Sequence, residues 1–231
     1  MTIADTEQPT APERLSTPLR VLLLIEVACA LFFVAQQALP LWHDRWVQDD
    51  AYISFRYAKN FVHGHGIVYN VGQRVEGYTN FLWMIISAIP MAAGAVDPLP
   101  FMQAFSMLLW IGSYALLLIL GIRLFREGVW IAPLALVPLT YHWSFNMWFF
   151  SGMETPLVSF LTIAMLFSFS FDPERHPSAL FVAALAAVGS TMTRPDGVVA
   201  LAALTAAGLI LYWRPLVRER RWRTYLLAPA L

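Results

Sequence analysis

The chain has 231 residues, of which 58% are hydrophobic and only 13% are charged, and its formal net charge is zero. A soluble domain usually carries about 25% charged residues, so this chain has too little charge to cover a water-exposed surface. The composition therefore predicts an all-α, polytopic membrane protein. It argues against a nucleic-acid-binding protein, because the only basic cluster is short and terminal.

The N-terminal region divides into a polar tail and a long apolar run. Residues 1–17 are rich in Pro, Thr and Glu and are expected to form a disordered cytoplasmic tail. The run LRVLLLIEVACALFFVAQQALPLW then predicts an uncleaved first membrane helix. A cleaved signal peptide is the alternative, since Ala28 and Ala30 form an A-x-A pattern, but the run exceeds the roughly 7–15 apolar residues of a signal peptide. Glu26 is costly in lipid and is expected either to face protein or water or to reach the cytoplasmic interface.

Further apolar segments follow at residues 81–95, 101–124, 129–150, 156–171, 179–191 and 198–213. A membrane-spanning helix needs about 20 residues, with a range of roughly 17–25. Segment 81–95 is short and is bounded by polar sequence on both sides. It is expected to span the membrane, to lie in the interface, or to re-enter on the same side.

The arginines and lysines favour a topology in which segment 81–95 does not cross the membrane. The cytoplasmic side then holds ten of the fifteen basic residues, whereas it holds only three if the segment crosses. The favoured topology has a cytoplasmic N-terminus and a multi-pass chain in the plasma membrane. It places four polar stretches on the outer face, where we expect the chemistry: QDDAYISFR, RVEGYTN, SGMETP and TRPDG.

The first outer loop, residues 42–80, is the longest polar stretch, and its sequence DDAYISFRYAKNFV predicts an amphipathic helix that lies on the membrane. Its apolar face is expected to hold Ala51, Tyr52, Phe55, Ala58 and Phe61, and the rest of its surface Arg56, Lys59 and Asn60. Asp49 or Asp50 would begin the helix. One carboxylate is enough for a helix cap, so the second makes a catalytic role the alternative interpretation.

The remainder of this loop, GHGIVYNVGQRVEGYTNFLW, predicts glycine-punctuated turns. Glu76 and Tyr78 stand where the loop returns to the membrane, a suitable place for a substrate contact. His63 and His65 flank Gly64 and are weak metal-ligand candidates, because no third ligand has a fixed spacing from them.

Two downstream motifs supply the other polar candidates. Glu154 in SGMETP precedes Pro156, which is also a plain helix-start pattern. Arg194 and Asp196 in TRPDG flank a proline, either as a turn with a local ion pair or as an arginine held to bind phosphate. The candidate substrate-binding residues are Arg56, Tyr57, Glu76, Tyr78, Asn80, Glu154, Arg194 and Asp196.

Taken together, DDAYISFRYAKNFVHGHGIVYNVGQRVEGYTNFLW, SGMETPL and TRPDG resemble the N-terminal half of bacterial GT-C-type glycosyltransferases. The likeness is to the cell-wall terminal arabinofuranosyltransferase group and runs from about residue 19 to residue 213. The first motif is long and fairly specific to this family. The other two are short, and they support the resemblance by their order and spacing. Such enzymes are polytopic and use polyprenyl-phosphate sugars, so membrane lipids and a glycan or lipid acceptor are the implied partners.

The resemblance implies a mechanism at the outer face. Asp49 or Asp50 would act as general base on the acceptor hydroxyl, which attacks the anomeric carbon with inversion. A cation must steady the departing lipid phosphate, and the candidates are Arg194 first and Arg56 second. The resemblance implies no certain cofactor. Because some members of the family use a divalent metal near the acidic motif, Mg²⁺ or Mn²⁺ stays open as an alternative.

The resemblance leaves alternatives open. Such enzymes are usually longer, so residues 18–231 are expected to form a GT-C-like transmembrane domain truncated at its C-terminus. The alternatives are a split enzyme that needs a second subunit and a compact relative of the family. The rival functions are a non-catalytic membrane fragment or lipid-carrier-binding partner and, less favoured, a transporter. The sequence shows no inverted repeat or paired broken helices of the kind that transporters have.

Overall fold

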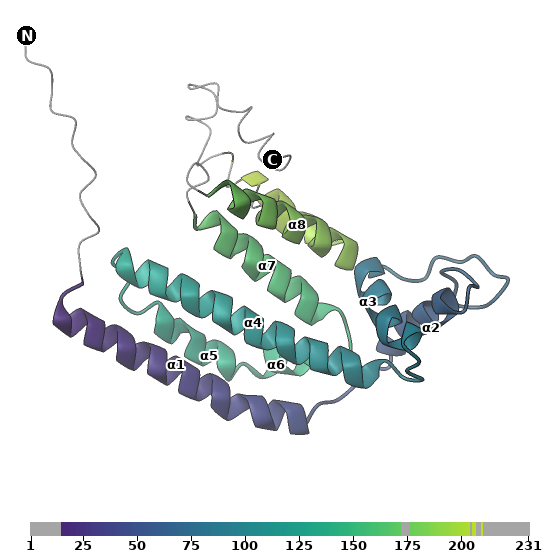
Figure 1. Ribbon diagram of the computed structural model, residues 1–231, viewed down its shortest axis with the longest axis horizontal. Coiled ribbons are helices and arrows are strands. Elements are labelled where there is room, and N and C mark those ends of the chain that lie inside the picture. The colour runs from purple at the N-terminus through teal and green to yellow at the C-terminus, as the bar shows by residue number, and fades with distance from the viewer. Residues whose placement is uncertain (1–14, 172–175, 204, 207–208, 210–231) are drawn as a thin grey trace, which may run out of the picture.

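The computed structural model describes residues 15–171, 176–203, 205–206 and 209, and in these ranges the chain forms helices and turns without any strand (Figure 1). The all-α prediction is confirmed for this part of the chain. Residues 1–14 of the expected tail lie outside the described residues. So do residues 204, 207–208 and 210–213 of segment 198–213 and everything that follows them.

Within the described ranges, two helices are long and apolar enough to cross a membrane, α1 (Thr17–His43) and α4 (Leu99–Arg126). Their 27 and 28 residues correspond to about 40 Å at 1.5 Å per residue, which exceeds a hydrocarbon core of about 30 Å. The two helices pack together in opposite directions, because Arg45, just after α1, donates a hydrogen bond to Gln103 in the first turns of α4. These helices are the features expected of a membrane protein.

Helices α7 (Thr155–Phe169) and α8 (Pro177–Thr193) form a hairpin that packs on α4 through α7, on the side away from α1 (Figure 1). A β-carbon added at Gly112 of α4 would lie 2.9 Å from the Phe160 ring of α7, and one at Gly189 of α8 would lie 3.1 Å from Leu161. These two glycines therefore allow the helices to approach closely.

The apolar pattern of segment 129–150 predicts one helix, and this prediction is wrong. The segment divides into η1 (Pro133–Ala135), α5 (Leu136–Thr140) and α6 (Trp143–Phe149). The polar groups at the break are satisfied internally: Asn146 Nδ2 donates to the Thr140 carbonyl at 2.6 Å, and Trp110 Nε1 donates to Asn146 Oδ1 at 3.1 Å. An interruption in apolar surroundings requires such partners.

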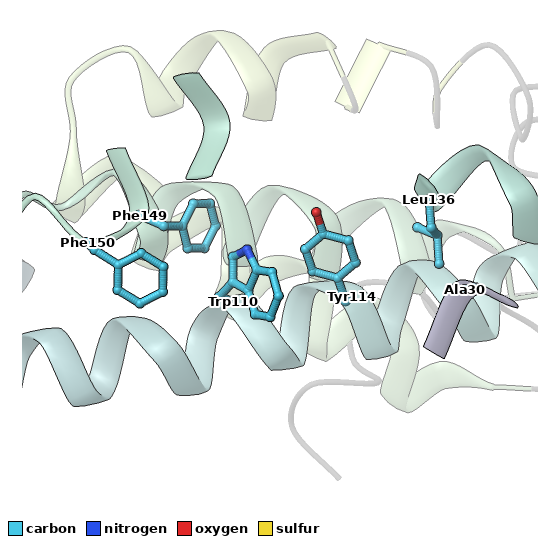
Figure 2. Close-up of a cluster of buried hydrophobic side chains, with 6 residues drawn as sticks. All are labelled: Ala30, Trp110, Tyr114, Leu136, Phe149 and Phe150. Carbon is cyan, nitrogen blue, oxygen red and sulfur yellow. The ribbon is translucent and has the colours of Figure 1, made fainter. Parts of the chain in front are cut away.

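One hydrophobic cluster joins the α1–α4 pair to the interrupted segment (Figure 2). Trp110 and Tyr114 lie one turn apart on α4, with their ring centroids 4.7 Å apart. Phe149 and Phe150 pack toward one end of this pair, and Leu136 with Ala30 toward the other (Figure 2). The cluster thus holds the broken segment against two long helices.

Helices α2 (Ala51–Val62) and α3 (Phe81–Ala92) pack on each other at one end of the bundle (Figure 1). The chain enters α3 at Asn80, which bonds to Ser54 of α2, and leaves it toward Asp97, which accepts a 3.5 Å hydrogen bond from Tyr52 of α2. The α3 segment therefore begins and ends beside the same helix.

Part of the expected apolar face of α2, namely Ala51, Phe55 and Ala58, is buried in the protein. Tyr52 and Phe61 are 44% and 42% exposed, whereas Asn60 is only 7% exposed. Asn60 turns inward because its amide donates to the carbonyls of Val68 and Tyr69, at 2.7 and 2.9 Å. The helix therefore packs partly on its own following loop, which its apolar periodicity does not encode.

Candidate functional site

The linker from α1 to α2, residues 44–50, is tied to the loop that precedes α7. Gln103 Nε2 donates to the carbonyls of Trp46 and Phe150, both at 3.2 Å, and Trp46 Nε1 donates to the Met147 carbonyl at 3.0 Å. The Gln48 N–H donates to the Ser151 carbonyl at 2.8 Å. These bonds fix the starting point of α2, and hence the acidic pair, beside the SGMETP motif.

Gly152 makes this close approach possible. Its φ of +82° is in the left-handed region, and an added β-carbon would lie 3.1 Å from Ala51 Cβ and 3.2 Å from Leu99 Cδ1. Its carbonyl accepts a 3.0 Å hydrogen bond from Trp83 Nε1 of α3. The glycine of SGMETP is therefore required both by conformation and by space.

Asp49 and Asp50 are both exposed at the start of α2. Asp50 occupies the N-cap position, but its side chain makes no capping hydrogen bond. The backbone carbonyls of the pair accept the first helical hydrogen bonds instead, from Tyr52 and Ile53. The two carboxylates are thus open to solvent, and the Asp50 side chain makes no bond that would support the capping alternative. A catalytic role for either residue stays a prediction.

A chain of polar side chains links all four motifs. Asn80 Nδ2 donates to Ser54 Oγ at 2.8 Å and to Glu154 Oε2 at 2.9 Å. Glu154 Oε1 accepts from Arg194 Nη1 at 3.3 Å. Ser54, Asn80 and Glu154 are all buried, at 4%, 6% and 5% exposure. The expected convergence of these motifs is observed, and Glu154 serves as its hub rather than as a capping residue, since it makes no cap bond.

Arg194 lies between two carboxylates. Its Nε donates to Asp196 Oδ1 at 2.9 Å, and Nη1 reaches Glu154. The hydrogen bond with Asp196 raises the pKa of Arg194 and holds the pKa of Asp196 below its usual value, although burial opposes both shifts. The local ion pair expected in TRPDG is therefore present. The Arg194 side chain is still 40% exposed, so it can meet a ligand.

Four of the candidate substrate-binding residues lie around the loop between α2 and α3 and not in this polar chain: Arg56, Tyr57, Glu76 and Tyr78. Tyr57 is only 1% exposed, and its hydroxyl donates to the Val75 carbonyl at 3.1 Å. Arg56 Nε donates to the Tyr69 carbonyl at 3.2 Å. Glu76 is exposed, and burial, followed by Glu76 and Tyr57, raises the pKa of Tyr78, whose hydroxyl therefore stays protonated at neutral pH. Substrate contacts by these residues stay predictions.

The two histidines do not form a metal centre by themselves. The His63 and His65 rings are parallel with centroids 6.5 Å apart, and His63 Nδ1 lies 2.7 Å from the Lys59 carbonyl. Among the described residues, no three His, Cys, Asp or Glu side chains gather as a metal site would require. A divalent metal ion stays a prediction.

Four residues that position this site were not predicted from the sequence: Arg45, Ser54, Asn60 and Gln103. Each binds a partner at least eight residues away in the sequence. Gln103 lies inside an apolar helix at 5% exposure, and a buried amide in such surroundings must be paired. The position of Gln103 within an apolar run could therefore have identified it from the sequence as a residue with a structural partner.

Comparison with known proteins supports the motif resemblance. No family model matches the chain, and no solved structure gives a significant match. A terminal β-(1→2)-arabinofuranosyltransferase of Mycobacterium tuberculosis is 29% identical over 195 residues, which cover 79% of this chain and 30% of that protein. A protein of the same name from Corynebacterium glutamicum is 43% identical over 42 residues, 18% of this chain and 6% of that protein. The chain is thus similar over most of its own length to terminal arabinofuranosyltransferases, and it spans less than a third of the first of them.

Proposed function

We propose that this chain is the N-terminal membrane part of a GT-C-type glycosyltransferase. The enzyme moves a sugar from a polyprenyl-phosphate donor to a glycan or lipid acceptor of the cell envelope, and a pentofuranose is the favoured sugar. The similarity to terminal arabinofuranosyltransferases supports the reaction class. The two long apolar helices support a membrane location.

One observation carries the proposal: the buried Glu154 carboxylate holds both Asn80 and Arg194. Burying a carboxylate is costly unless it is paired and hydrogen-bonded. Here Asn80 and Arg194 supply that pairing, and the carboxylate holds Arg194 at the surface beside the end of the first outer loop. A fold that needed only stability would be served as well by an apolar side chain at this position.

The proposed transfer needs a base and a cation. Asp49 or Asp50 takes the proton of an acceptor hydroxyl, and the oxygen attacks the anomeric carbon of the donor. The bond from that carbon to the phosphate oxygen breaks, and its electron pair leaves with the polyprenyl phosphate, giving inversion. Arg194, held by Glu154 and Asp196, stabilises the phosphate charge as it develops. No step passes through a metal ion.

The proposed topology is multi-pass in the plasma membrane, with a cytoplasmic N-terminus and the site on the outer face. In this topology the end of the bundle away from the site lies on the cytoplasmic side. Arg123, at the end of α4, stands at that end, where its Nη2 donates to the Ser170 carbonyl just after α7 at 2.9 Å. The basic residue count favours this orientation. Because α3 begins and ends beside α2, it does not need to cross.

The test is sugar transfer by purified protein in detergent from polyprenyl-phosphate pentoses and hexoses, with and without the product of the downstream gene. An Asp49→Asn, Asp50→Asn double variant is expected to lose transfer. Asp44→Asn is the matched control, because Asp44 is an exposed acid of the same linker and pairs with His43. Arms with EDTA, Mg²⁺ or Mn²⁺ report on a metal requirement.

Absence of transfer by wild type under every condition would contradict the proposal. It would favour a non-catalytic membrane protein that binds a lipid carrier. Uptake of the intact donor into vesicles without transfer would point to a transporter.

A further inference from the structure

A cavity of about 310 Å³ opens beside α2, between the helix and the loop that follows it. Its lining is neutral throughout and consists of Ile53, Tyr57, Tyr69, Asn70, Gln73, Val75 and Gly77. Arg56 lies over the Tyr69 ring, 6.0 Å from its centroid, and donates to the Tyr69 carbonyl. The lining side chains themselves supply no charge that would compensate a phosphate. Their amide and aromatic groups instead match an uncharged ligand that carries hydroxyl groups.

A tight turn at one wall of the cavity presents paired amides. The Gln73 N–H donates to the Asn70 carbonyl at 3.1 Å, and Gly72 supplies the φ of +86° that the turn requires. Asn70 Nδ2 also donates to Gln73 Oε1 at 3.1 Å. Asn70 Oδ1 then remains an acceptor and Gln73 Nε2 a donor, side by side, which suits hydroxyl groups that both donate and accept.

The remainder of the lining is rigid. Tyr57 lies against Tyr69 with ring centroids 5.7 Å apart, and its hydroxyl is bound to the Val75 carbonyl. An added β-carbon at Gly77 would lie 2.7 Å from the Tyr57 hydroxyl oxygen, so only glycine fits there. The buried Asn60 amide fixes the backbone at Val68 and Tyr69. The site is therefore preformed, which lowers the entropy lost on binding.

The size and the exposed ring favour a monosaccharide unit. The volume of about 310 Å³ lies at the lower end of the roughly 300–1,000 Å³ that small-molecule sites occupy, which suits one monosaccharide unit. Tyr69 is 43% exposed and offers a ring beside the amides, on which the C–H groups of a sugar can pack.

The cavity lies next to the acidic pair. Ile53 is four residues after Asp49 and three after Asp50, which amounts to about 5–6 Å along a helix. Ser54, four residues after Asp50, begins the polar chain to Arg194. The start of α2 thus separates a neutral sugar cavity from a cationic site.

We propose that this cavity is an acceptor subsite that holds a neutral sugar unit of the glycan, with Asn70, Gln73 and Tyr69 as its specificity residues. The inference rests on the proposed glycosyl transfer for its role in catalysis. Binding of the sugar itself can be measured independently of transfer.

The experiment measures binding of a short neutral arabinofuranosyl oligosaccharide to the full chain in detergent, by ligand-observed NMR and calorimetry, with inorganic phosphate as the charged probe. The Asn70→Ala, Gln73→Ala double variant is expected to weaken oligosaccharide binding about 25-fold, at roughly fivefold for each lost hydrogen bond. Tyr69→Phe retains the ring and should bind within twofold of wild type. Val71→Ala is the matched control, since Val71 belongs to the same turn, is 60% exposed and does not line the cavity.

The outcomes separate the two proposals. If transfer is observed, the double variant should raise the acceptor KM and leave the donor KM unchanged, and unchanged kinetics would overturn the subsite. If wild type binds the oligosaccharide but transfers nothing, the subsite stands and the proposed function fails. Failure of wild type to bind, or preferential binding of phosphate at this turn, would overturn the subsite. Circular dichroism and thermal unfolding verify that each variant is folded.

Discussion

Glu154 and Arg194 meet at 3.3 Å although forty residues separate them, and they do so unequally: the side chain of Glu154 is 7% exposed and that of Arg194 is 40% exposed. The carboxylate is inside and fixed by Asn80, whereas the arginine stands at the surface. Moving such a pair out of water costs desolvation free energy, which can exceed the attraction between the two charges. The pair therefore contributes little net stability. Its effect is to hold the guanidinium in one place, which is the property that a phosphate-binding arginine needs.

Replacing Arg194 by lysine is expected to reduce kcat about 100-fold or more, because an ammonium group cannot bond Glu154, Asp196 and a phosphate in the same planar arrangement. The measurement is kcat and donor KM in the transfer assay. Arg74→Lys is the matched control, since Arg74 lies in the exposed loop. Equal behaviour of the two variants would remove Arg194 from the reaction.

Truncating Glu154 to alanine is expected to destabilise the protein by about 1–3 kcal/mol, because the buried Asn80 amide loses its acceptor. Glu154→Gln retains an oxygen for Asn80 and should cost less stability, while it still weakens transfer by releasing Arg194. Thermal unfolding in detergent measures the first effect and kcat the second. Glu127→Ala, at an exposed acid after α4, supplies the baseline. A Glu154→Gln variant with full activity would show that the ion pair is dispensable.

The two aspartates should respond unequally to substitution by asparagine. Asp49 precedes Ile53 of the neutral cavity by one helical turn, and Asp50 precedes Ser54 of the polar chain by one turn. If the acceptor occupies the cavity, Asp49→Asn should lower kcat about 100-fold or more, and Asp50→Asn should stay within tenfold of wild type. Equal and mild losses would contradict a general base at this pair and favour a structural role.

Gly152→Ala is expected to destabilise the junction of the linker and the SGMETP loop by about 1–3 kcal/mol, from backbone strain and from overpacking against Ala51 and Leu99. Gly128→Ala serves as the control, because its φ is +97° but nothing lies within 4 Å of the added carbon. The difference in unfolding temperature between the two variants therefore reports the close approach alone. Identical losses would show that space at Gly152 is not limiting.

The Arg194–Asp196 pair should make a small, pH-dependent contribution to stability. Because the folded-state pKa of Asp196 lies below its usual value, the contribution is present above about pH 3.9 and is lost as the pH falls through the folded-state pKa. Asp196 is 61% exposed, so solvent screening limits the contribution to about 0–1 kcal/mol. Asp196→Asn should therefore lower the unfolding temperature slightly at pH 7 and not at all well below pH 3.9. A large loss at pH 7 would indicate a buried role.

The sequence predicted what depends on local pattern. The helix after Asp50, the turns at Gly64 and Gly72, and the ion pair of Arg194 with Asp196 follow from propensity and spacing, and all are present. The gathering of the motifs at one end was also predicted, because the alternation of membrane segments brings every second loop to the same side.

The interruption of segment 129–150 and the inward turn of Asn60 could not be predicted in this way. The first depends on Trp110, an aromatic donor on another helix that meets Asn146. The second depends on the path of a loop whose carbonyls need a donor. Both features depend on single hydrogen bonds between polar groups that lie apart in the sequence. Hydrophobic periodicity carries no information about such bonds.

The lengths of α7 and α8 have a further consequence for the surrounding lipid. Their 15 and 17 residues correspond to about 22 and 26 Å at 1.5 Å per residue, less than a hydrocarbon core of about 30 Å. In the proposed multi-pass topology, a bilayer that surrounds this hairpin would have to become thinner locally. Glu154 and Arg194 would then lie below the level of the undisturbed headgroups. The phosphate of the proposed polyprenyl donor would meet the arginine there without having to leave the membrane.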